Sequence, residues 1–181
     1  MKEKKYELTD DIIEPFYNCT MYRIKALKDF GDVKKGQLGG FVASEDNLSQ
    51  DGNCWINHYA MVFGNAHIFG NAQLYVHAKV YGDAEIYGNA KVYGDAEVSG
   101  YAEICGDAEV KSVDDYSLFK NFWSSGRSFT WTKSNDMWKV GCFYGTGDEL
   151  IKKAYDKSEE NGKNYETTVN YVKQITNGKE I

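Results

Sequence analysis

The segment Gly82–Tyr93, GDAEIYGNAKVY, holds two copies of a six-residue unit in which alanine, an aliphatic residue and glycine keep fixed positions. The unit reads Ala-x-(Val/Ile/Leu)-x-Gly-(Asn/Asp) and continues without a slip through the middle of the chain. Its alanines are Ala60, Ala66, Ala72, Ala78, Ala84, Ala90, Ala96, Ala102 and Ala108. A short, fixed period of this kind indicates a solenoid, so the repeat decides the architecture.

The alternation of side chains along a β-strand explains the composition of the unit. Residues two apart share a face, so the alanine and the aliphatic residue both point inward. The following Gly-Asn or Gly-Asp pair accepts the positive φ of a corner. Three sides close a coil of 18 residues, and about twelve units over residues 42–113 predict about four coils. Weaker units at Val42, Leu48 and Cys54 continue the alanine phase toward the N-terminus.

The repeat resembles the hexapeptide repeat of bacterial acyltransferases, and its ungapped run is similar to bacterial and phage proteins described as polymer-forming. The resemblance extends to Tyr22–Val33, Leu38–Phe41, Glu45–Ser49 and Gly141–Thr146. It implies a single-stranded left-handed β-helix. One departure is that a residue, often Tyr, separates the aliphatic residue from the glycine. Handedness is therefore implied by the resemblance, and the spacing alone also allows a right-handed solenoid.

Composition excludes several classes of protein. The 181 residues carry 21 Lys+Arg and 27 Asp+Glu, a net charge of −6, so direct nucleic-acid binding through an overall positive charge is not expected. Residues 42–113 contain 3 of the basic and 10 of the acidic side chains, which places the acidity on the solenoid. No apolar run reaches a membrane span, and the N-terminus lacks a signal peptide, so we expect a cytoplasmic protein with no membrane partner.

The segments on either side of the repeat differ from it in composition. Residues 1–41 predict an N-terminal β cap, with a strand over residues 20–27. Residues 114–181 predict a small α+β module, with a hairpin over residues 128–143 and a first helix opened by the capping box of Thr146 and Glu149. We expect Asn161-Gly162 to stop that helix and Asn164 to cap a second one, whose inward residues are Tyr165, Val169, Val172 and Ile175.

Positions 18 residues apart lie above one another on the predicted solenoid. Lys79 then pairs with Glu97, and Lys91 with Glu109. Corner residues Asn53, Asn71, Asn89 and Asp107 form a ladder, and the aromatic pairs are Phe63–Tyr81, Phe69–Tyr87 and Tyr75–Tyr93. These aromatic columns either stabilise the stack or form an assembly surface made of Phe63, Tyr75, Tyr81, Tyr87 and Tyr93.

Catalytic templates fit the chain poorly. An acyltransferase of this fold uses a histidine base at a cleft between subunits, whereas His58, His67 and His77 lie in uninterrupted coils with no matching motif. No metal site and no cofactor are expected. The binding candidates are aromatic rings combined with cations in the C-terminal module: Trp123, Arg127, Trp131, Lys133 and Trp138. The alternative for this group is the hydrophobic core of the module itself.

The sequence therefore favours a non-enzymatic β-solenoid that binds or assembles through its surfaces. We expect the protein to self-associate, most simply as a trimer. We also expect it to be phage-encoded and to act on a host factor. One alternative is sequestration of a small nucleotide-like ligand. Another is a hexapeptide-type acyltransferase, which would depend on His67 or His77.

Overall fold

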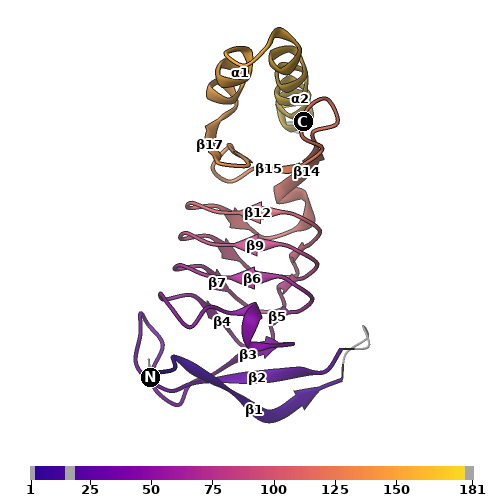
Figure 1. Cartoon of the computed structure of the whole chain (residues 1–181). Helices are drawn as coiled ribbons and strands as arrows, with labels where there is room; N and C mark the ends of the chain where they lie inside the picture. Colours follow the sequence, from indigo (N-terminus) through magenta and orange to yellow (C-terminus); the bar gives the residue numbers. More distant parts are fainter. Residues whose placement is uncertain (1–2, 15–18, 178–181) are drawn as a thin grey trace.

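The computed structural model describes residues 3–14 and 19–177 and is mainly β. A β-hairpin lies at one end, a solenoid of stacked coils follows, and an antiparallel sheet with two helices closes the other end (Figure 1). The predicted fold class is confirmed, because four parallel-paired coils lie between an N-terminal β cap and a small C-terminal α+β module.

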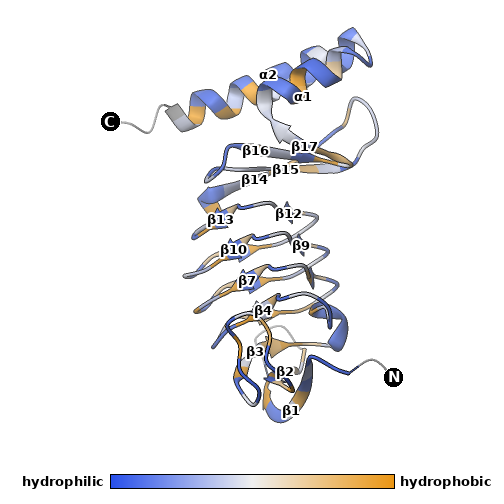
Figure 2. Ribbon diagram, turned by 90° about the vertical axis from the view of Figure 1, so that its left-hand side faces the viewer, coloured by the Kyte–Doolittle hydropathy of each residue, from blue (hydrophilic) through white to orange (hydrophobic). Residues whose placement is uncertain are grey.

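The solenoid is built from two-residue strands separated by corners. They are β4 (Trp55–Ile56), β5 (Met61–Val62), β6 (His67–Ile68), β7 (Gln73–Leu74), β8 (Lys79–Val80), β9 (Glu85–Ile86), β10 (Lys91–Val92), β11 (Glu97–Val98), β12 (Glu103–Ile104) and β13 (Glu109–Val110). Partners in a sheet are parallel and 18 residues apart, as in the pairing of Lys91 with Glu109. The three sides of the coil are therefore three parallel sheets, whose stacked coils are seen from a second side in Figure 2.

The repeat residues fill the interior as the alternation predicts. Every alanine from Ala60 to Ala108 is completely buried, and so is the aliphatic residue two places after each. Glycine is required at the corners because the coils approach closely there: Gly88 has φ +70°, and a Cβ on it would lie 2.8 Å from the amide nitrogen of Gly106. His58 and Val76 occupy the same kind of corner with φ of +51° and +62°.

The outward ladders are confirmed for the two charged pairs and for Asn71, Asn89 and Asp107 of the amide column, whereas the place of Asn53 in that column stays a prediction. Lys79 pairs with Glu97 at 2.8 Å, and Lys91 pairs with Glu109 at 3.2 Å. The amide of Asn89 accepts a hydrogen bond from Asn71 at 3.1 Å and donates one to Asp107 at 2.9 Å. Contacts of this kind between neighbouring strands are worth about 0.2–1 kcal/mol each.

The first coil departs from the predicted phase. Val42 pairs with Val62, and Leu48 pairs with Ile68, so both lie in the aliphatic columns at a separation of 20 residues, not in the alanine phase. Ile56 returns to the 18-residue spacing by pairing with Leu74. Two extra residues are therefore accommodated in the corner after Leu48, which the weak repeat in this region did not reveal.

The N-terminal cap consists of β1 (Tyr6–Ile13) and β2 (Met21–Ala26), which extend the sheet of β3 (Leu38–Val42). The predicted strand over residues 20–27 is confirmed by β2. Next to β1, the buried ammonium group of Lys5 donates to the carbonyl oxygens of Cys54 at 3.0 Å and Asp51 at 3.3 Å. The Tyr6 hydroxyl donates to the Leu48 carbonyl at 2.8 Å. Burial lowers the pKa of Lys5, so hydrogen bonds to carbonyls must offset its desolvation.

The C-terminal sheet consists of β14 (Tyr116–Lys120), β15 (Ser128–Thr132), β16 (Met137–Val140) and β17 (Phe143–Thr146), paired in that order. The predicted hairpin corresponds to β15 and β16. Hydroxyls from this region accept hydrogen bonds from main-chain N–H groups in the upper coils. Tyr116 accepts from Ser99 at 3.3 Å, Thr130 from Glu103 at 3.0 Å and Ser134 from Glu109 at 2.7 Å. The module thus caps the upper end of the solenoid on all three of its sides.

Two helices cover the outer face of this sheet: α1 (Gly147–Tyr155) and α2 (Glu159–Asn177). The Thr146 capping box with Glu149 is confirmed. The predicted stop at Asn161-Gly162 is wrong, because α2 continues through it; Gly162 lies against the Tyr155 ring, where a Cβ would be 2.2 Å from a ring carbon.

Two further details of α2 correct the sequence prediction. Asn164 lies inside the helix and donates to the Glu160 carbonyl at 2.8 Å, so it is no N-cap. Tyr165, Val169 and Val172 are buried as predicted, but Ile175 is 42% exposed. Within the described residues, no helix is long and apolar enough to cross a bilayer.

Replacing Thr130 by Val should destabilise the protein because the Glu103 N–H then loses its acceptor. Leaving a buried donor unpaired costs about 1–3 kcal/mol, which lowers the melting temperature by roughly 2–4 °C for each kcal/mol in a chain of this size. Thermal unfolding followed by circular dichroism measures the change. Thr130→Ser, which keeps the hydroxyl, should lose less, and an unchanged melting temperature in Thr130→Val would show that this capping bond is dispensable.

Candidate functional site

The structure separates the five binding candidates predicted in the C-terminal module. Trp131 and Trp138 are buried, with exposures of 4% and 1%, and they pack with Phe129 in the module core. The Trp131 indole also donates to Asp136 at 2.8 Å. Trp123 is half-buried and sets its ring edge-on against Tyr165 at 5.2 Å. The core interpretation describes these tryptophans better than a surface for stacking.

The two cations of the predicted group lie in different places. Lys133 is exposed beside the turn between β15 and β16. Arg127 is exposed at the end of the loop between β14 and β15, where it lines a cavity of about 320 Å³. This C-terminal pocket is the candidate functional site, and Arg127 is the predicted residue that contributes to it.

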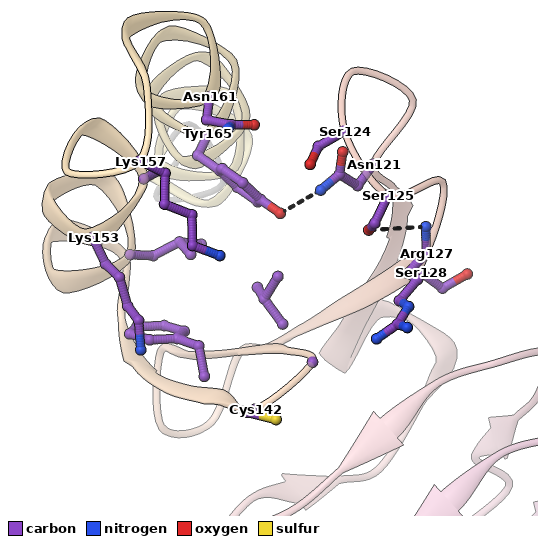
Figure 3. A pocket seen from close by; sticks show the side chains of 15 residues that line it. Asn121, Ser124, Ser125, Arg127, Ser128, Cys142, Lys153, Lys157, Asn161 and Tyr165 are labelled. Carbon is purple, nitrogen blue, oxygen red and sulfur yellow. Dashed lines mark hydrogen bonds between the residues drawn. The ribbon is translucent and has the colours of Figure 1, made fainter.

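Several segments build the C-terminal pocket, which Figure 3 shows from close by. Residues 121–128 form one wall, and α1 with the start of α2 forms the opposite one. The turn between β16 and β17 closes the lower side with Gly141 and Cys142. The capping box fixes the direction in which α1 leaves β17, and so determines how far the helical wall lies from the loop.

The charged lining of the pocket has one sign. Arg127, Lys153 and Lys157 line it, and none of the described lining residues carries a carboxylate. Within residues 3–14 and 19–177, none of these three cations forms an ion pair. Lys153 instead lies over the Phe143 ring, 5.4 Å from its centroid. The pocket therefore presents positive charge that no neighbouring acid neutralises.

Neutral polar groups and apolar side chains complete the lining. Ser124, Ser125 and Ser128 add hydroxyls, and Val140, Phe143 and Leu150 add apolar surface. Asn121, which is 5% exposed, donates from its amide to the Tyr165 hydroxyl at 2.7 Å. Burial raises the pKa of Tyr165, which keeps its hydroxyl protonated.

The other end of the Asn121 amide is unsatisfied. Its Oδ1 is buried and has no hydrogen-bond partner among the described residues. Buried polar atoms in native proteins are nearly always paired, so an orphan on a residue that lines a pocket needs an explanation. Because this oxygen is closed to solvent, it is a cost within the pocket wall and not a contact offered to a ligand.

Sequence reasoning missed the lysines of this pocket. Lys153 lies on the last turn of α1, and Lys157 lies in the turn that follows it, two residues after Tyr155. Their position beside the apolar stripe of Leu150 and Ala154 was a usable signal. Their convergence with Arg127, more than 20 residues earlier, depends on the packing of α1 against the sheet and was not readable from spacing.

The histidines lie on the solenoid, away from this pocket. The His67 ring is 5.0 Å from Phe69, and the His77 ring stacks on Tyr59 at 5.8 Å. His58 occupies a corner with positive φ, as the glycine phase predicts. In the described part of the chain, no three His, Cys, Asp or Glu side chains are grouped to hold a metal ion.

The aromatic columns contribute to stacking inside one chain. Phe63 stacks on Tyr81 at 5.0 Å, and Phe69 stacks on Tyr87 at 4.7 Å. Phe63 is only 8% exposed because it clusters with Met21 of the N-terminal hairpin. Tyr75, Tyr81, Tyr87 and Tyr93 are half-buried on the solenoid surface. Their role in assembly stays a prediction.

Comparison with known proteins gives one partial match. A stretch of 52 residues is 44% identical to a protein of Escherichia coli (strain K12) named uncharacterized acetyltransferase YdcK. The match covers 28% of this chain and 16% of that protein, so the chain spans a small part of its relative's length. No protein-family model matches the chain. Together with the parallel coils, the match fits a hexapeptide-repeat β-helix protein.

Truncating Trp131 should test whether it belongs to the core or to a binding surface. Trp131→Ala should lower the free energy of unfolding by about 3–5 kcal/mol, because it leaves a cavity in the module core and removes the partner of Asp136. Lys133→Ala, at an exposed position on the adjacent turn, should change it by less than about 0.5 kcal/mol. Urea unfolding measures both values. Equal stability of the two variants would contradict the core assignment.

Proposed function

We propose that this protein is a β-solenoid ligand-binding protein that holds a small phosphorylated molecule in its C-terminal pocket. The observation that carries the proposal is the convergence of Arg127, Lys153 and Lys157, without a neutralising carboxylate, on one cavity.

The four cysteines are free, and Cys142 is exposed, which favours a reducing compartment such as the cytoplasm.

The lining suits a phosphate ester better than a purely apolar ligand. Arginine and lysine are the usual partners of phosphate oxygens, and serine hydroxyls add neutral donors. The apolar surface from Val140, Phe143 and Leu150 offers contact to the organic part of the same molecule. A cavity of about 320 Å³ is at the lower end of the range for small-molecule sites, which favours a metabolite-sized ligand.

The residues of the pocket favour binding over turnover. Its titratable lining consists of Arg127, Lys153 and Lys157 with Cys142 and Tyr165, and no histidine or carboxylate of the described chain joins them as a general base. Sequestration of a nucleotide-like molecule needs no more than this lining. The solenoid serves as the rigid support that holds the module in place.

Pyrophosphate should raise the melting temperature of the wild-type protein, because a ligand that binds only the folded state stabilises it by mass action. At 100 times its Kd the stabilisation is about 2.7 kcal/mol. The double variant Lys153→Gln/Lys157→Gln should abolish the shift, since each charge-assisted hydrogen bond contributes about 1.5–3 kcal/mol. Differential scanning fluorimetry over a concentration series measures it.

The control for this experiment is Lys133→Gln, which removes one lysine charge from an exposed turn outside the pocket. Lys133→Gln should keep the full shift. An equal loss of the shift in Lys133→Gln, or no shift in the wild type with any phosphorylated probe, would contradict a specific anion site.

Self-association and a host protein partner are further parts of the proposed function. The half-buried Tyr75, Tyr81, Tyr87 and Tyr93 support self-association, and Phe63 contributes less because the N-terminal hairpin covers it. Multi-angle light scattering over a range of concentrations tests this part. A monomer at every concentration would remove the trimer.

Acetyl transfer is the second candidate function, and the similarity to uncharacterized acetyltransferase YdcK favours it. The candidate bases are His67 and His77, which line neither the C-terminal pocket nor a cleft with Cys142. His67 lies beside Glu85 in the pairing of β6 with β9, but within residues 3–14 and 19–177 no ion pair joins a histidine to a carboxylate. The geometry of one chain thus supports this function less than binding.

Incubation with acetyl-CoA and a panel of amine acceptors tests the second candidate. We expect no release of free CoA thiol above the rate without protein, as read with a thiol-reactive dye. Cys142→Ser serves as the control for reaction of the dye with the exposed protein thiol. Sustained thiol release that His67→Ala or His77→Ala abolishes would replace the binding proposal by acetyl transfer.

A further inference from the structure

A second cavity adjoins the C-terminal pocket and differs from it in charge. This flank cavity, of about 610 Å³, lies between the upper coils of the solenoid and the module. Its lining shares Arg127, Ser128 and Gly141 with the C-terminal pocket. Arg127 therefore belongs to both cavities.

The flank cavity carries charges of both signs: Asp83, Glu85 and Glu103 line it from the solenoid, and Lys120 and Arg127 line it from the module. Glu85 and Glu103 are neighbours on adjacent coils and line it together. Glu103 is neutralised by Lys139 at 3.0 Å and accepts from the Tyr87 hydroxyl at 3.2 Å. Glu85 is exposed and has no ion pair within the described residues. His67 lies beside Glu85 on the other neighbouring strand and does not line the cavity. Because like charges on adjacent strands repel each other, Glu85 favours a cation or an N–H donor on its cavity side.

An aromatic ring completes the flank cavity. Tyr101 lines it and is 64% exposed. A free aromatic face offers a platform on which a planar ring can stack, and stacking on a side chain is tolerant of the identity of the ring. An ionised carboxylate only accepts hydrogen bonds, so a ring recognised by both residues must carry N–H donors.

We propose that the ligand is a nucleotide-like molecule that spans both cavities, with its phosphate on Lys153 and Lys157 and its donor-bearing base between Tyr101 and Glu85. Arg127 lies at the junction, where its guanidinium can contact the sugar or the phosphate. This inference rests on the proposed anion site and adds the class of its ligand.

Two probes that differ only in the base separate the two cavities. GMP carries two adjacent N–H donors on its base, which match the two oxygens of a carboxylate, whereas ribose 5-phosphate has the same phosphate end and no base. Isothermal titration calorimetry should give a Kd for GMP roughly tenfold or more below that of ribose 5-phosphate, as expected for one stacking contact and one charged hydrogen bond.

Variants of the flank cavity should affect only the probe that has a base. Glu85→Gln should weaken GMP binding about tenfold and leave ribose 5-phosphate unchanged or slightly tighter, because removal of a negative charge favours any phosphate. Tyr101→Ala should weaken GMP, and Tyr101→Phe, which keeps the ring, should not. Asp95→Asn is the matched control, since it removes an exposed carboxylate of the solenoid outside both cavities.

The outcomes distinguish this inference from the proposed function. Equal affinities for GMP and ribose 5-phosphate, or a Glu85→Gln variant that binds both probes more tightly, would overturn the spanning ligand and leave the anion site intact. Loss of binding of both probes in Lys153→Gln/Lys157→Gln is expected. No binding of either probe to the wild-type protein would overturn the anion site and the inference together.

Discussion

The parallel pairing of the coils leaves unpaired main-chain groups on the free edge of the first coil and of the last coil, and this determines what each end of the solenoid needs. Between two coils, N–H groups of one donate to carbonyls of the next, as Gln73 does to Ala90 at 2.9 Å, and the parallel register returns bonds in the opposite direction. Each free edge therefore carries both N–H and carbonyl groups that need partners. The caps supply such partners: the ammonium of Lys5 donates to the first coil, and hydroxyls such as that of Thr130 accept from the last.

The same requirement explains the two faces of the C-terminal sheet. Side chains alternate along β15, so Thr130 points to the last coil while Phe129 and Trp131 point to the helices. One strand therefore caps the solenoid and forms a second hydrophobic core. The loop before β15 leaves this sheet at its edge, next to α1. This loop forms the wall of the C-terminal pocket that carries Arg127.

The fold was predictable because every unit of the repeat meets nearly the same surroundings, so that one unit specifies the other eleven. The prediction failed where surroundings change. The two extra residues after Leu48 enlarge the corner that holds Lys5, which no local pattern encodes. Gly162 reads locally as a helix stop, yet it lets α2 continue by giving the Tyr155 ring room. Arg127 was found from the sequence, but the lysines that face it depend on tertiary packing.

A repetitive surface cannot by itself build a unique binding site. Any arrangement of side chains on one coil tends to recur 18 residues later, as the stacked Lys–Glu pairs and the Asn ladder do. Uniqueness arises where the repeat meets a segment of different composition. At the upper end, the acidic coil around Glu85 adjoins a module in which Arg127, Lys153 and Lys157 form no ion pair within the described residues. The two surfaces differ in the sign of their charge because they belong to different parts of the chain. A ligand with two chemically different ends can contact both surfaces at their boundary.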